Sequence, residues 1–173
     1  MTNLQNYTPA MRFIAIFILF MLLSSCATFL SYESSMLRIE TITPKYMEHN
    51  DFVSINEYLT GKETSKNRLI IRSKEATRSG LYLILSLNEK IRDLPPDTNI
   101  ICEIFMPGNL NPEIFEFPLP RVNKLPNNKD LFLGITGSDW PYGDDALPTA
   151  WKITFVDSNE TTIAEKSSQV WSL

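Results

Sequence analysis

Residues 79–87 read SGLYLILSL, and this stretch decides the fold class. Its four leucines alternate with Tyr82, Ile84 and Ser86, which is the period of a β-strand that turns one face toward a core. Ser79-Gly80 supplies turn chemistry in front of the strand. We therefore expect a strand whose inward face is made of Leu81, Leu83, Leu85 and Leu87.

The same alternation recurs along the chain. Similar β-like segments cover residues 37–43, 68–73, 100–104, 115–119, 131–135, 151–155 and 161–171. Turn residues separate them, with little room for helix. This pattern predicts an all-β fold, an antiparallel β-sandwich of about eight strands with immunoglobulin-like architecture. The comparison is by architecture only, because no pair of cysteines flanks a tryptophan.

Two local features refine this expectation. Asn50 or Asp51 is placed to cap one short helix, with Phe52, Ile55 and Leu59 on one side and Gly61 at its end. We expect this helix to lie across an open end of the sandwich. Pro118 cannot donate to a strand ladder, so its strand belongs at a sheet edge.

Composition excludes several function classes. The 173 residues are enough for one domain, and 43% of them are hydrophobic. Sixteen basic residues against 20 acidic ones leave no concentrated basic footprint, so nucleic acid is not an expected partner. Two cysteines and one histidine make neither a zinc cage nor a disulfide framework. Phosphate-binding glycine motifs are absent, and we expect no cofactor, no metal and no enzymatic activity.

The N-terminal region carries an apolar run, FIAIFILFMLL, over residues 13–23. Eleven helical residues span only about 16 Å, against a hydrocarbon core of about 30 Å. That length is typical of the apolar region of a signal peptide rather than of a membrane-spanning helix.

The run ends in Leu23-Ser24-Ser25-Cys26, which resembles the lipobox of bacterial lipoproteins. The resemblance implies cleavage before Cys26 and acylation of its thiol, hence a signal peptide over 1–25, a lipidated cysteine and short tether over 26–35, and a sandwich domain over 36–173. Ala27 follows the cysteine, where the family's inner-membrane retention signal is typically an aspartate. The resemblance therefore implies a lipid anchor in the cell envelope, on the periplasmic face of the outer membrane. The alternative is that Cys26 only ends an anchor helix.

The acidic loop at 137–148 is the candidate binding surface, formed by Asp139, Trp140, Tyr142, Asp144 and Asp145. Aromatic residues carry much of the binding energy at interfaces. The alternative is that Trp140 folds back as a plug over the end of the sandwich, and this reading is slightly favoured. The carboxylates match no calcium-loop spacing.

Three other features have ordinary explanations. Cys102 alternates with Ile100 and Ile104, which predicts a packed core thiol. His49 lies in a polar stretch and is expected to be a solvated loop residue. A basic stretch either faces an anionic surface or forms a solvated face, and it comprises Lys62, Lys66, Arg68, Arg72, Lys74 and Arg78.

The hypothesis drawn from these patterns is a membrane-anchored, non-catalytic lipoprotein whose sandwich is an envelope scaffold or protein-interaction module. Its expected partners are the membrane, through acyl chains, and envelope proteins. The alternative is a module that binds an envelope glycan or polymer through the 137–148 loop. A hydrolase is least favoured, since no acid–base pair is visible. The sequence identifies no small-molecule ligand.

Overall fold

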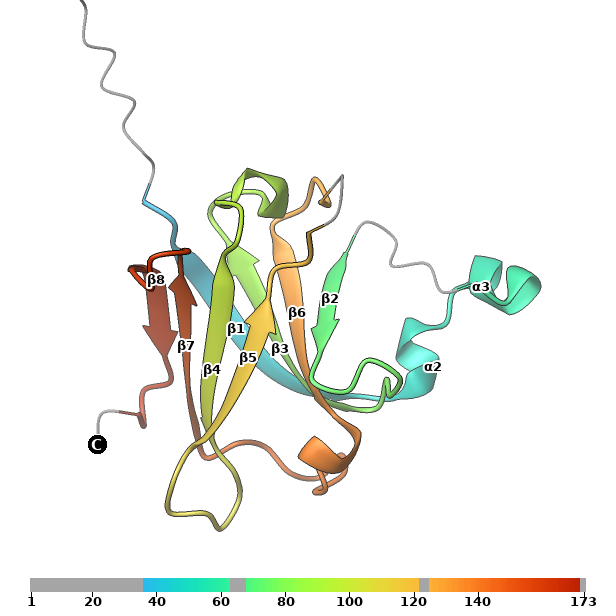
Figure 1. Cartoon of the computed structure of the whole chain (residues 1–173). Coiled ribbons are helices and arrows are strands. Elements are labelled where there is room, and N and C mark those ends of the chain that lie inside the picture. The colour runs from blue at the N-terminus through green and yellow to red at the C-terminus, as the bar shows by residue number, and fades with distance from the viewer. Residues whose placement is uncertain (1–35, 63–67, 122–124, 172–173) are drawn as a thin grey trace, which may run out of the picture. The chain divides into compact units, whose positions relative to one another are not determined.

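The computed structural model describes residues 36–62, 68–121 and 125–171. Within these residues, eight strands form two four-stranded sheets that share one core (Figure 1). One sheet has the order β1-β3-β6-β2, built from β1 (Ile39–Met47), β3 (Gly80–Leu87), β6 (Asp130–Thr136) and β2 (Leu69–Arg72). The other has the order β5-β4-β7-β8, built from β5 (Glu113–Pro118), β4 (Asn99–Phe105), β7 (Ala150–Val156) and β8 (Thr162–Ser167). The predicted all-β sandwich is confirmed.

The strand order is that of an immunoglobulin-like sandwich. Strands β1, β3 and β6 take the places of strands A, B and E, while β4, β7 and β8 take those of C, F and G. One pair departs from the antiparallel expectation, because β2 runs parallel to β6. The reason is topological: β1 ends at the far end of the sheet, at Met47, whereas β2 begins at the end at which β6 begins, so that Leu69 pairs with Leu131.

The core follows the alternation seen in the sequence. The four leucines of β3 at 81, 83, 85 and 87 are fully buried, and they pack in one cluster with Ile100, Ile104 and Phe155 of the facing sheet. Burial of side chains of this size contributes about 1.5–3 kcal/mol each and is the main stabilising term of the fold. Strand β5 lies at the edge of its sheet, which confirms the position expected for Pro118.

The helical prediction is partly wrong. The chain forms two short helices, α2 (His49–Phe52) and α3 (Ile55–Thr60), whose N-caps are Glu48 and Ser54 rather than Asn50 or Asp51. Val53 is extended between them, and the Ser54 hydroxyl accepts a hydrogen bond from the Glu57 amide, which starts a new helix. Gly61 ends α3 with a left-handed φ of 68°, as expected.

The helices also do not lie across an open end. Phe52 packs on the outer face of the first sheet, in a second apolar cluster with Met47, Tyr82 and Phe132. Helix α3 projects beyond β2 (Figure 1), and Ile55 and Leu59 are 81% and 76% exposed. These two side chains are therefore not part of a packed apolar face.

The sandwich has two distinct ends. The chain enters at one of them, where the Asn88 side chain accepts from the Arg38 amide at 2.7 Å and donates to the Met36 carbonyl at 3.2 Å. This entry end also carries the β3–β4, β5–β6 and β7–β8 connections (Figure 1). The opposite far end carries the β4–β5 and β6–β7 connections, and β1 also ends there, before the helices.

Candidate functional site

The far-end loop 137–148 does not present its tryptophan to solvent. Trp140 is only 3% exposed and belongs to the main core, and its indole Nε1 donates to the Gly143 carbonyl at 3.0 Å. Tyr142 packs edge-on against the Trp140 ring, with centroids 5.2 Å apart, and is half-buried. Trp140 thus packs as a plug over the end of the sandwich, which is the slightly favoured alternative, and almost none of its side chain is exposed for binding.

The carboxylates of this loop are dispersed. Asp139 forms an ion pair with Lys74 at 3.3 Å, whereas Asp144 and Asp145 are exposed. Within residues 36–62, 68–121 and 125–171, no three histidine, cysteine or acidic side chains come together as a metal site. Of the five candidate residues, Asp144 and Asp145 are therefore solvated, and Tyr142 is half-buried.

The basic stretch is largely engaged with the outer face of the first sheet. The Arg72 guanidinium lies 5.2 Å from the centroid of the Phe52 ring, and its Nε donates to the Tyr82 hydroxyl at 3.0 Å. Arg68 lies over Phe132 in the same manner. Arg78 forms a 2.6 Å ion pair with Glu57, so these arginines serve structural contacts. Lys66 falls outside the described residues.

Cys102 lies where it was expected, whereas His49 is exposed as expected but belongs to a helix rather than a loop. His49 is the first residue of α2, and its backbone amide donates to the Ser79 hydroxyl. Cys102 is fully buried in the core. Burial, together with the negative charge of neighbouring Glu103, raises the pKa of the Cys102 thiol from 9.0 to about 12. The thiol is therefore an apolar core group without nucleophilic character at neutral pH.

This burial predicts that Cys102 is inert in the folded protein. At pH 8 a pKa of about 12 lowers the thiolate fraction roughly a thousandfold relative to a pKa of 9.0, before any steric protection is counted. In the 27–173 fragment, whose single thiol is Cys102, a chromogenic disulfide should react within minutes in denaturant and not in buffer. Equal rates in both solutions would contradict the packed-core position.

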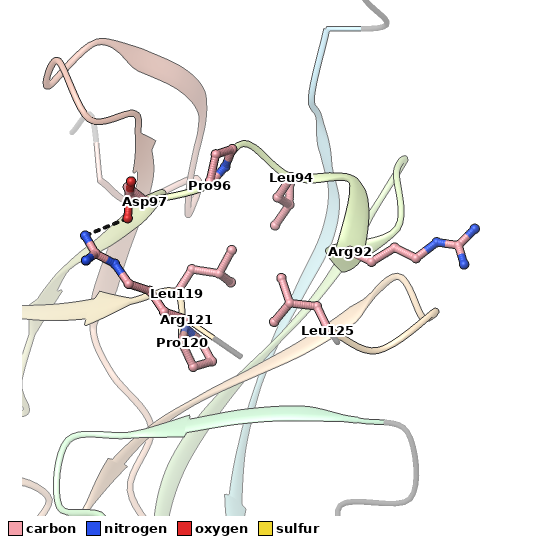
Figure 2. Close-up of a pocket in the computed structure, with 8 residues that line it drawn as sticks. All are labelled: Arg92, Leu94, Pro96, Asp97, Leu119, Pro120, Arg121 and Leu125. Atoms are coloured by element: carbon pink, nitrogen blue, oxygen red, sulfur yellow. Dashed lines mark ion pairs between the residues drawn. The ribbon is translucent and has the colours of Figure 1, made fainter. Parts of the chain in front are cut away.

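A pocket of about 590 Å³ opens at the entry end, and sequence reasoning missed it. Its apolar wall comes from the β3–β4 and β5–β6 connections and consists of Leu94, Pro96, Leu119, Pro120 and Leu125. Figure 2 shows the three leucines converging on the opening. On one side Arg121 forms an ion pair with Asp97 at 2.7 Å, and on the other Arg92 pairs with Asp93 at 3.4 Å.

The lining of this pocket combines apolar side chains with charged side chains that are paired. Its arginines already have carboxylate partners, its floor is apolar, and none of the described residues that line it carries a hydroxyl, thiol or imidazole. The Leu94-Pro95-Pro96-Asp97 turn was the available sequence signal, but a turn motif does not reveal that a second turn lies opposite it.

Several membrane-related predictions concern residues outside the described part of the chain. The signal peptide at 1–25, Cys26 and the segment 26–35 all belong to this group. Among the described residues, no helix is long and apolar enough to cross a membrane.

Comparison with known proteins gives one structural similarity. No family model and no curated protein matches the chain. Among solved structures, the crystal structure of an immunoglobulin-like protein from Pseudomonas aeruginosa is similar, with 15% identity and a TM-score of 0.31. The similarity covers 76% of this chain and 93% of that one.

Proposed function

We propose that this chain is a bacterial lipoprotein whose β-sandwich is held at a membrane by an acylated Cys26 and acts by binding rather than by catalysis. The observation that carries the proposal is the lipobox-like Leu23-Ser24-Ser25-Cys26 directly after an eleven-residue apolar run. Only nine residues, 27–35, then separate the cysteine from Met36, with which the described sandwich begins.

The acyl chains must supply the attachment, because the charge of the mature chain does not. Cleavage before Cys26 removes Arg12 as the only charged side chain, which leaves 16 − 1 = 15 basic residues against 20 acidic ones, a net charge of −5. A chain with this net negative charge is not attracted electrostatically to anionic lipid headgroups. Two or three acyl chains bind stably, at about 0.8 kcal/mol per buried methylene. Ala27 after the cysteine supports the periplasmic face of the outer membrane as the location.

The partners proposed for the sandwich are other envelope proteins. The connection between β4 and β5 at the far end presents Leu110, which is 93% exposed, and Ile114, at the start of β5, is 62% exposed. Large apolar side chains held in solvent are typical anchors of protein contacts. The alternative, a glycan module built on the 137–148 loop, is not favoured because its principal aromatic residue, Trp140, is buried.

Metabolic labelling tests the anchor. Cells that express the full chain and are fed a clickable fatty acid should label the wild-type protein, and Cys26→Ser should abolish the label completely. Cys102→Ala is the matched control, since it removes the chain's other cysteine, which is buried, and should keep full labelling. Label that persists in Cys26→Ser would refute the lipobox assignment.

A further inference from the structure

Helix α3 is held on the sandwich by its polar side. The Glu57 carboxylate and the Arg78 guanidinium form an ion pair at 2.6 Å, and their side chains are only 11% and 14% exposed. The Ser54 hydroxyl, which caps the helix through the Glu57 amide, belongs to a residue that is 3% exposed. No residue of α3 itself is buried, and this ion pair joins the helix to the loop before β3.

The apolar side of α3 consequently faces solvent. Ile55, Tyr58 and Leu59 are 81%, 84% and 76% exposed. Positions i, i+3 and i+4 of a helix share one face, so these three side chains form a single surface, here called the α3 tip. Surface helices ordinarily bury the apolar face and expose the polar one. In α3 the apolar face is exposed instead, and the helix projects beyond β2 (Figure 1).

We propose that the α3 tip is a second membrane contact, inserted among the lipid headgroups of the bilayer that holds the acylated Cys26. This inference rests on the anchor proposed above. The tip is an exposed surface of one aromatic and two aliphatic side chains. Such a surface suits the headgroup region of a bilayer, where tyrosine is enriched.

The length of chain outside the structure allows this contact. The nine residues 27–35 span at most about 30 Å, and the nine residues of β1, between the entry end and the helices, span about 30 Å as well. A sandwich lying on its side can therefore touch the bilayer with α3 while its entry end stays within reach of Cys26.

Tethering also compensates for the small size of the tip. A single fourteen-carbon acyl chain binds membranes only reversibly, with an association constant of about 10⁴ M⁻¹, and the tip has less apolar surface to bury. A short linker to the same surface gives an effective concentration in the millimolar range, which is sufficient for a weak contact to be occupied. The tip therefore orients the domain, and the acyl chains retain it.

A fluorescent reporter tests this orientation. The acylated full-length protein carries the substitution Leu59→Cys, and the new thiol is labelled with nitrobenzoxadiazole. Only this thiol reacts, because Cys26 is blocked by lipid and Cys102 is buried. The labelled protein is reconstituted into phosphatidylethanolamine and phosphatidylglycerol vesicles with and without headgroup-level doxyl-phosphatidylcholine. We expect a blue shift and roughly twofold quenching at position 59. Leu110→Cys, at an even more exposed leucine of the far end, is the control and should stay unquenched.

Each other outcome overturns the inference and identifies what failed. If the protein floats with the vesicles but the fluorescence at position 59 is not quenched, the lipid anchor is supported and the contact through the α3 tip is refuted. Quenching at both 59 and 110 would show the far end against the bilayer. A blue shift that needs no vesicles and grows with protein concentration would mean that a second copy covers the tip. Protein that does not float would refute the anchor and the contact together.

Discussion

Replacing Gly134 by alanine is expected to destabilise the sandwich by about 3 kcal/mol or more, as overpacking of a rigid core site does. A Cβ at this position would lie 2.5 Å from Cε1 and 2.9 Å from Cζ of Tyr82. The ring cannot move aside cheaply, because the Tyr82 hydroxyl donates to the Arg78 carbonyl at 2.7 Å and accepts from Arg72 at 3.0 Å. Urea unfolding of the full-length variant measures the loss.

A double-mutant cycle isolates the cause. In a Tyr82→Ala background the ring is gone, and Gly134→Ala should then cost less than about 1 kcal/mol, with an interaction energy of about 2 kcal/mol or more. Of the three nearest atoms, Thr136 Cγ2, at 3.1 Å, would then remain beside the added methyl group. An equal cost of Gly134→Ala in both backgrounds would show that the clash with Tyr82 is not the reason for glycine at 134.

Trp140→Ala is expected to cost about 3–5 kcal/mol, which corresponds to a fall of roughly 2 M in the urea midpoint. The physical reason is loss of a buried indole together with its hydrogen bond to the Gly143 carbonyl, both at the far end of the core. Tyr142→Ala is the matched control. Its ring is half-buried and packs on Trp140 from outside, so its removal should cost much less.

The same pair of variants separates a plug from a ligand-binding residue. A tryptophan that stacked on a glycan would be exposed in the free protein, and its removal would leave the unfolding midpoint nearly unchanged. An unchanged midpoint in Trp140→Ala would therefore reinstate the contact surface at 137–148 and remove the packing assigned to this loop.

The strands were predictable because burial of one face of a sheet gives a local sequence pattern, in which every second residue is apolar. Leu81 to Leu87, Ile100 to Ile104 and Trp151 to Phe155 each turn alternate side chains into the core, as their sequences indicate. Cys102 was placed correctly by the same argument. Pro118 was assigned to an edge strand from the hydrogen bond that it cannot make.

The features that could not be predicted correctly depend on contacts between residues that are distant in sequence. The side of α3 that faces the sheet is decided by the Glu57–Arg78 ion pair, and the periodicity of Ile55 and Leu59 gives no sign of it. The parallel pairing of β2 with β6 and the pocket between two separate turns likewise need the assembled fold. For Trp140, the residue type allowed a plug or a contact surface, and only its packing in the core distinguishes them.

Intact-mass and peptide spectrometry of the protein extracted from its native membrane is the most direct test of the lipid anchor. A polypeptide that begins at Cys26, without residues 1–25 and heavier by two or three fatty acyl groups on its first residue, is the predicted species. A chain that retains residues 1–25 and carries an unmodified thiol at position 26 would contradict the account.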